Sequence, residues 1–191
     1  MESTTTYWTA ADEAPATRED AEKVWVDETH RILTRVAGTY RGLIESSALA
    51  SELQETTGFH TRAQVRTWIA PVLATVAREC QDSGEPPLTS LVVLKASGMV
   101  GPMYDAAMRL SGDAPPETDL EREKHAAAAR HECYLWAGAD MPADGGSAAL
   151  SERYAASESR ARKARLAEAV PNVCPSCFMA IPPTGICDNC D

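Results

Sequence analysis

The sequence is poor in aromatic residues and in long apolar runs. Aromatic residues make up 6% of its 191 positions, so alanine, leucine and valine must supply most of any core. No stretch approaches the ~18 to 20 apolar residues that span a bilayer. The first 20 residues hold no apolar run of the kind that a signal peptide needs. The sequence therefore predicts a protein of the cytoplasm that has no membrane partner.

The chain also lacks an excess of positive charge. Its 18 Lys and Arg residues stand against 28 Asp and Glu residues, which gives a formal net charge of −10. Affinity for nucleic acid comes largely from the neutralisation of phosphates. The composition therefore disfavours a protein that coats DNA along its whole surface, while one local reading surface stays open.

Recognised catalytic patterns are missing as well. The sequence contains no G-x-S-x-G, no Walker loop, no H-E-x-x-H and no D…E-x-K cluster of the nuclease type. Its four histidines and scattered acids form no Ser/His/Asp or paired-carboxylate arrangement. His125 and His131 are six apart on one predicted helix and would point to different sides of it. The sequence favours a non-enzymatic protein.

The sequence does contain a dense group of cysteines at its end. Four of the six cysteines lie in CPSCFMAIPPTGICDNCD (174–191) as two C-x2-C pairs separated by nine residues. In a reducing compartment such pairs are typical of metal sites. Zinc prefers four ligands in a tetrahedron and accepts thiolate sulfur at ~2.3 Å. We expect one structural zinc ion in a short zinc ribbon, with four ligands: Cys174, Cys177, Cys187 and Cys190.

Two alternatives to zinc are a pair of disulfides and a redox C-x2-C motif. A redox motif normally opens a helix, which Pro175 and the nearby second pair do not fit. Pro182, Pro183 and Gly185 supply the chain reversal that four ligands need. A catalytic zinc ion is not expected, because four thiolates leave no open position for water. A ribbon of this size depends on its metal for folding, and it occurs in DNA-binding proteins and adaptors alike.

Capping signals divide the rest of the chain into helices. Boxes of the S/T-x-x-E type begin at Thr17, Thr61 and Thr118, and glycines follow the apolar stripes at the far ends. Pro71 lies inside the third stripe, so we expect a kink or a break near Thr67. The predicted elements are helices 17–38, 47–57, 61–83, 104–110, 118–136 and 148–168, a strand at 39–44 and a β-hairpin at 88–102.

This order of elements resembles a winged helix-turn-helix, in which the hairpin strand LTSLVVL would pair with TYRGLI. The predicted fold class is therefore mainly α (α+β): a winged-helix-like domain with a β-hairpin, two further helices and a C-terminal zinc ribbon. The predicted domains are a flexible leader at 1–16, the winged-helix-like domain at 17–112, a linker at 113–117, a helical region at 118–169 and the ribbon at 170–191.

A winged helix would place its third helix in the major groove of DNA. The side chains exposed at the start of that helix would include Arg62, Gln64 and Arg66, with His60 and Thr61 beside them, and Lys95 at the wing tip would meet a phosphate. A basic arm in the last helix would extend the contact through Arg160, Arg162 and Lys163. Residues 24–110 hold eight basic and nine acidic side chains, however, so a protein-binding adaptor is the alternative.

Three segments of the sequence resemble a group of uncharacterised actinobacterial proteins. They are EPPLTSLVV with GMVG, HECYLWAGADMPADGG, and the ribbon CPSC…CDNC. The resemblance implies a winged-helix-like middle and a zinc ribbon, and it implies no activity.

The remaining tryptophans and cysteines fit a core. Trp25, Trp68 and Trp136 fall on apolar helix faces, as do Cys80 and Cys133, which we expect to behave as small core residues. Trp8 lies in the predicted leader and would dock on the body or on a partner.

Overall fold

The computed structural model describes residues 6–11, 14–168, 173–181, 187 and 189–190. Its contacts divide the chain into two compact units, Met1–Tyr154 and Ala155–Asp191. The first unit is called the body and the second the tail unit. The predicted linker at 113–117 lies inside the body.

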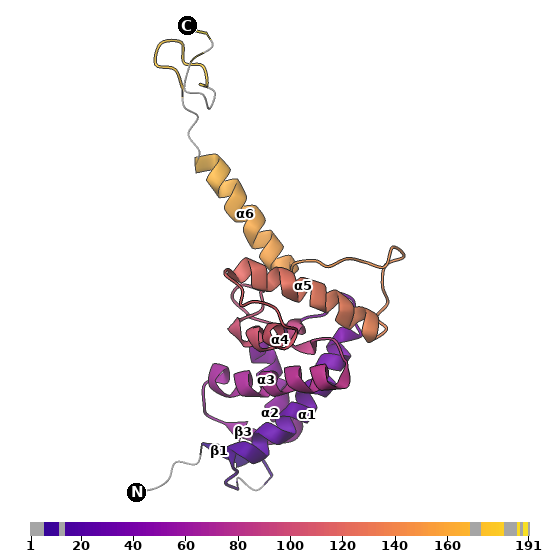
Figure 1. The fold of residues 1–191 in the computed structure, drawn as a ribbon. Helices are drawn as coiled ribbons and strands as arrows, with labels where there is room; N and C mark the ends of the chain where they lie inside the picture. The colour runs from indigo at the N-terminus through magenta and orange to yellow at the C-terminus, as the bar shows by residue number, and fades with distance from the viewer. Residues whose placement is uncertain (1–5, 12–13, 169–172, 182–186, 188, 191) are drawn as a thin grey trace, which may run out of the picture. The chain divides into compact units, whose positions relative to one another are not determined.

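The protein is mainly helical, with two small sheets (Figure 1). The α-helices are α1 (Arg18–Ala37), α2 (Ser46–Thr57), α3 (Val65–Ser83), α4 (Asp105–Leu110), α5 (Asp119–Trp136) and α6 (Glu152–Glu168). The strands are β1 (Tyr7–Thr9), β2 (Ile44–Glu45), β3 (Phe59–Thr61) and β4 (Val92–Val93), and two 3-10 turns are η1 (Leu88–Leu91) and η2 (Pro102–Tyr104). Within the described residues no helix has both the length and the apolar character that crossing a bilayer requires.

Two of the predicted helix caps are confirmed. Thr17 precedes α1, and its hydroxyl oxygen accepts a hydrogen bond from the backbone N–H of Asp20 at 3.1 Å. Thr118 serves α5 in the same way through the N–H of Glu121. Each bond satisfies one of the backbone donors that a helix start leaves unpaired.

The third predicted cap is wrong, because Thr61 belongs to a strand. β3 pairs antiparallel with β1, so residues 59–61 are extended and α3 begins only after Gln64. The same pairing corrects the prediction of a flexible leader at 1–16, because Tyr7–Thr9 forms strand β1 against β3. Trp8 stacks on His60 there, with ring centroids 5.7 Å apart. The docking of Trp8 on the body is thus the alternative that the structure supports.

Of the kink or break predicted near Thr67, the break does not occur, because α3 continues through Pro71. Proline removes one hydrogen bond from a helix, but the helix is held on both sides of it by buried side chains. Trp68 and Ile69 precede the proline and Val72 and Leu73 follow it, all fully buried or nearly so. Packing of this face outweighs the loss of a single bond.

The predicted strand at 39–44 is mostly a turn. Arg41 adopts a left-handed conformation with a φ of 62°, and the N–H of Gly42 bonds to the carbonyl of Thr39 at 2.8 Å. A side chain at Gly42 would lie 2.6 Å from the carbonyl oxygen of Val36, so only glycine fits. Only Ile44 and Glu45 form a strand.

The two-stranded hairpin predicted at 88–102 does not form. Leu88–Leu91 is a 3-10 turn with all four residues buried, and only Val92–Val93 is a strand. That strand does pair with β2, as predicted for the two segments, but in parallel and over two residues. The short apolar run reflects burial rather than a strand, an ambiguity that composition alone does not resolve.

The body has one main core with a smaller one beside it. α1 packs on α2, α3 and η1, and α5 packs on η1 and α1. Trp25 and Trp68 meet at its centre with ring centroids 4.2 Å apart, and Cys80 and Cys133 are fully buried there. Trp136 is an exception to the predicted core, because it lies at the end of α5 and is 42% exposed.

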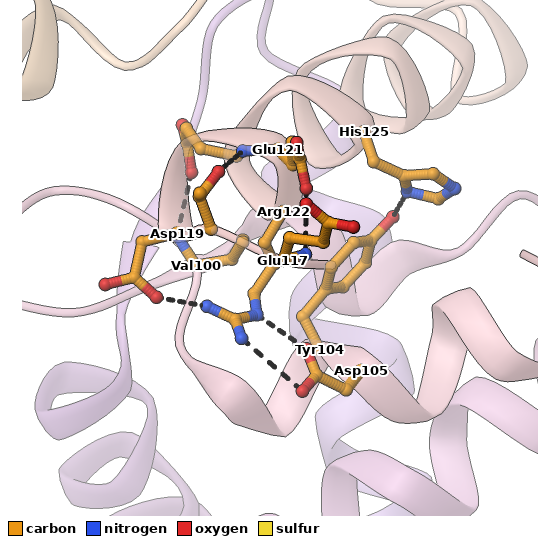
Figure 2. A network of polar contacts seen from close by, with 10 residues as sticks. Val100, Tyr104, Asp105, Glu117, Asp119, Glu121, Arg122 and His125 are labelled. Atoms are coloured by element: carbon orange, nitrogen blue, oxygen red, sulfur yellow. Dashed lines mark hydrogen bonds and ion pairs between the residues drawn. The ribbon is translucent and has the colours of Figure 1, made fainter. Parts of the chain in front are cut away.

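A polar network attaches the start of α5 to α4 beside the smaller core (Figure 2). The guanidinium of Arg122 donates to Asp105 on α4 and to Asp119 on its own helix. The hydroxyl of Tyr104 bonds to the Nδ1 atom of His125 at 2.9 Å. These contacts fix the register of α5 over the body.

Candidate metal centre

The four tail cysteines lie together in the tail unit. The Sγ atoms of Cys174, Cys177, Cys187 and Cys190 all lie within 4.8 Å of one another. Cys174 and Cys190 are separated by 3.6 Å between sulfurs, and Cys177 and Cys187 by 3.4 Å. The sequence-predicted ligand set is therefore brought together, and it could hold a metal ion.

The sulfur separations fit a tetrahedral site. A disulfide would need ~2.05 Å between sulfurs, and all four cysteines are free thiols. Four sulfurs at ~2.3 Å from a central ion lie about 3.8 Å apart along each tetrahedral edge. The two shortest separations, 3.4 and 3.6 Å, are close to that edge and the other pairs stay within 4.8 Å, so the four thiols could hold a metal ion.

The first C-x2-C turn is fixed by its own backbone. The N–H of Phe178 donates to the carbonyl of Cys174 at 2.8 Å, and the N–H of Cys174 donates to the carbonyl of Met179 at 2.8 Å. Val173 and Ala180 form an antiparallel bridge next to this turn. Phe178 takes a left-handed φ of 57°, which is unfavourable for a bulky residue. The predicted reversal at Pro182, Pro183 and Gly185 lies outside the described residues.

Backbone N–H groups favour the thiolate form at this turn. The N–H groups of Cys177 and Ser176 point at the sulfur of Cys174 and lower its pKa to about 6. The N–H of Met179 lowers the pKa of Cys177 in the same way. The neighbouring sulfurs of Cys177 and Cys174 raise the pKa of Cys190 to about 11. A cysteine that binds a metal ion must be deprotonated. A cation among the four sulfurs would offset the repulsion between their negative charges and so favour this form.

Large apolar side chains of the tail unit face solvent. Phe178 is 79% exposed and Met179 is 59% exposed, and Val173 is about half exposed. These three residues flank the first C-x2-C turn, and they are called the knuckle surface. A metal ion on the four cysteines would therefore fix the backbone that displays this apolar surface.

The predicted DNA-reading residues are only partly assembled. Arg62 lies over the ring of Trp8, at 5.2 Å from its centroid, while Gln64 and Arg66 are exposed at the start of α3. Lys95 is exposed in a tight turn closed by a bond from the N–H of Leu94 to the carbonyl of Met99. The wing that would have carried this lysine does not form.

The basic residues of α6 are exposed but do not share one face. Arg160 and Lys163 are three apart and lie on one side of the helix. Arg162 is two residues from Arg160, which is about 200° around the axis. All side chains of residues 155–166 are exposed. The arm is thus a charged helix without a single phosphate-facing stripe.

A buried ion pair in the body was not found from the sequence. Glu123 and Arg130 are seven apart on α5 and therefore share a face, with 2.7 Å between Oε1 and Nη1. The carboxylate also accepts the N–H of Val100 at 2.8 Å, and the Nε of Arg130 donates to the carbonyl of Ser90. The signal in the sequence was the helical spacing of two opposite charges on an apolar face.

Arg130 also lines a concavity of about 340 Å³ in the body, with Arg41, Tyr134 and Arg153 among its other walls. Glu45 pairs with Arg153 there at 3.1 Å. Arg130 is already bonded to the carboxylate of Glu123 and to the carbonyl of Ser90. Its positive charge is therefore neutralised inside the body by Glu123.

The two histidines of α5 do not form a metal pair, in agreement with their spacing. His125 bonds to Tyr104 and Asp113, and the Nε2 of His131 bonds to the carbonyl of Gly145. Comparison with protein-family models, with curated proteins and with solved structures finds no match to this chain.

Proposed function

We propose that the protein is a non-enzymatic, zinc-dependent adaptor of the cytoplasm, which binds a protein partner through its tail unit. The observation that carries this proposal is the exposure of Phe178 and Met179 beside the cysteine cluster. Exposed apolar patches on ordered backbone mark interaction surfaces.

Zinc is the ion that suits this site best. Four thiolates in a tetrahedron are typical of structural zinc, and they leave no coordination position for a substrate. A single structural ion then fixes the turn that displays the knuckle surface. A reducing compartment keeps the thiols available for the metal.

The distribution of charge supports a protein partner. Residues 155–191 hold four Lys and Arg and four Asp and Glu, so the net charge of −10 belongs to the body. An acidic body repels phosphates and does not hinder contact with a protein.

The test distinguishes the contribution of the apolar knuckle surface to partner binding from the contribution of the metal. We would compare capture from source-cell lysate by the wild type, by the double variant Phe178→Ser/Met179→Ser and by a chelated sample. The variant keeps all four cysteines, so its zinc content should equal that of the wild type. We expect the same partner to be lost from the variant and from the chelated sample, and a nuclease should have no effect. Undiminished capture by the zinc-loaded variant would refute the proposal.

A second candidate is a DNA-associated or regulatory protein that contacts DNA through the start of α3 and through α6. The exposed Gln64 and Arg66 at the start of α3 favour it, together with Arg160, Arg162 and Lys163 on α6. DNA binding should then fall steeply with salt and weaken in Arg66→Ala. The absence of a retarded band at low salt would leave only the adaptor.

A further inference from the structure

A second group of metal-ligating side chains lies in the body, far in sequence from the tail cysteines. His30, Cys80 and Glu85 each offer a ligand atom, and these atoms all lie within 4.8 Å of one another. The Nε2 atom of His30 is 2.6 Å from a carboxylate oxygen of Glu85. The group joins α1 to the C-terminal end of α3.

The end of α3 explains why two of these residues meet. Gly84 ends the helix in a left-handed conformation with a φ of +69°. The chain therefore reverses, and the N–H of Glu85 donates to the carbonyl of Cys80 at 2.8 Å. This glycine-dependent turn is a common helix ending. It holds Glu85 against the last turn of α3, where His30 of α1 approaches from the other side.

An open concavity of about 460 Å³ lies at the same place. Its walls are Asp27, His30, Glu79, Ser83 and Glu85. Three of the five are acidic and none is Lys or Arg, so the concavity attracts cations. Cys80 is fully buried behind it, whereas His30 and Glu85 are partly exposed. An ion would therefore enter from solvent and meet the sulfur last.

Other roles for the cluster fit less well. A cysteine nucleophile must be reachable by its substrate, whereas Cys80 is fully buried. A simple ion pair accounts for His30 and Glu85, but it does not account for the thiol beside them or for Asp27 and Glu79 around the opening.

We propose that His30, Cys80 and Glu85 bind a second divalent transition-metal ion of the zinc class, with one coordination position open to the acidic concavity. Mixed nitrogen, sulfur and oxygen donors suit zinc and its neighbours, while calcium and magnesium prefer oxygen alone. Three protein ligands would leave the fourth position of a tetrahedral ion to a water molecule from the concavity. The His30–Glu85 bond would open to about 3.3 Å between ligand atoms around a tetrahedral ion.

The experiment is zinc stoichiometry by equilibrium dialysis of the full chain followed by elemental analysis. We expect two equivalents for the wild type and one for each of His30→Gln and Cys80→Ala. The matched controls His131→Gln and Cys133→Ala remove the same residue types elsewhere and should keep two. Circular dichroism checks that each variant is folded, and the partly exposed His30 is the safer position if Cys80→Ala unfolds.

The variant Cys177→Ser/Cys187→Ser distinguishes zinc bound at the tail site from zinc bound at His30, Cys80 and Glu85. It should keep one equivalent, and cobalt(II) bound to it should show a spectrum with one sulfur ligand instead of four. A wild type that binds a single equivalent, lost entirely in the tail variant, would overturn the proposal. So would a second equivalent that survives in His30→Gln. Neither result bears on the adaptor function, which depends on the tail alone.

Discussion

The body and the tail unit hold their folds by different means. The body buries large apolar side chains, with Trp25 and Trp68 in contact at its centre. In the described part of the tail unit Cys174 alone is buried, and the apolar residues Phe178 and Met179 face solvent. One chain thus combines a domain stabilised by the hydrophobic effect with a segment whose four clustered cysteines could hold a metal ion. The two should respond independently to perturbation.

The largest expected difference concerns metal removal. In Cys177→Ser the tail loses one of four ligands, and a zinc-binding free energy on the order of 10 kcal/mol supports folding at such sites. We expect backbone amides of residues 173–181 to lose all protection from hydrogen exchange, while the body keeps its protection. Ser176→Ala is the control that leaves the ligands intact. Simultaneous loss of protection in α1 and α3 would show that the two units are coupled.

The converse perturbation acts on the body alone. Trp25→Ala empties a fully buried site, and such changes cost about 3–5 kcal/mol. That loss is a large part of the stability of an ordinary domain, and urea denaturation followed by circular dichroism will measure it. Trp136→Ala, at a half-exposed position, should cost less than about 1 kcal/mol. Equal effects of the two substitutions would contradict the observed core.

The buried ion pair offers a polar test of the same core. Glu123→Gln leaves the charge of Arg130 buried without a counter-charge, which typically costs about 3 kcal/mol or more. The exposed Glu117→Gln is its control. Denaturation midpoints should separate the two variants clearly, and an unchanged midpoint for Glu123→Gln would mean that Arg130 reaches solvent.

Alkaline pH should weaken the body. Burial raises the pKa of Cys133 from 9.0 to about 12 and that of Tyr134 from 10.0 to about 12. The folded body therefore keeps protons that the unfolded chain releases above about pH 9. Stability from these groups is complete below pH 9 and declines as the pH rises toward 12. Thermal unfolding between pH 7 and pH 11 measures this, and a midpoint that stays constant over that range would be contrary evidence.

The smallest effect should occur at the left-handed residue of the tail. A side chain in this conformation costs roughly 1–2 kcal/mol, which glycine avoids. Phe178→Gly should therefore tighten zinc binding about fivefold or more in competition with a chelator, where 1.4 kcal/mol corresponds to a factor of ten. Phe178→Ala keeps the β-carbon and should show no such gain. Tighter binding in both variants would assign the effect to the aromatic ring instead.

Several local signals in the sequence predicted the structure correctly. The caps at Thr17 and Thr118 depend on residues three positions away, and the cysteine ligands depend on two short spacings. Thr61 carries the same capping signal but forms part of a strand, because it pairs with Tyr7 of β1, which lies 54 residues earlier in the chain (61 − 7). Pairing with a distant strand overrides the local preference for a helix cap, and the sequence around Thr61 does not indicate this pairing.

The same reasoning explains which parts of the candidate sites were missed. His30, Cys80 and Glu85 come from two helices and a turn that meet only in the folded body. Glu123 and Arg130 had a visible helical spacing, but charged residues are usually assigned to the solvent side. The basic residues of α6 were predicted to form an arm that contacts phosphates, and they are exposed. Their use for DNA stays a prediction.

The pair formed by Trp25 and Trp68 has a practical consequence. All four tryptophans of the chain lie in residues 1–154 and none in residues 155–191. With centroids 4.2 Å apart, the two indole rings are close enough for their electronic transitions to couple. Intrinsic tryptophan fluorescence therefore comes entirely from residues of the body, and a probe placed in the tail unit is needed to follow the cysteines directly.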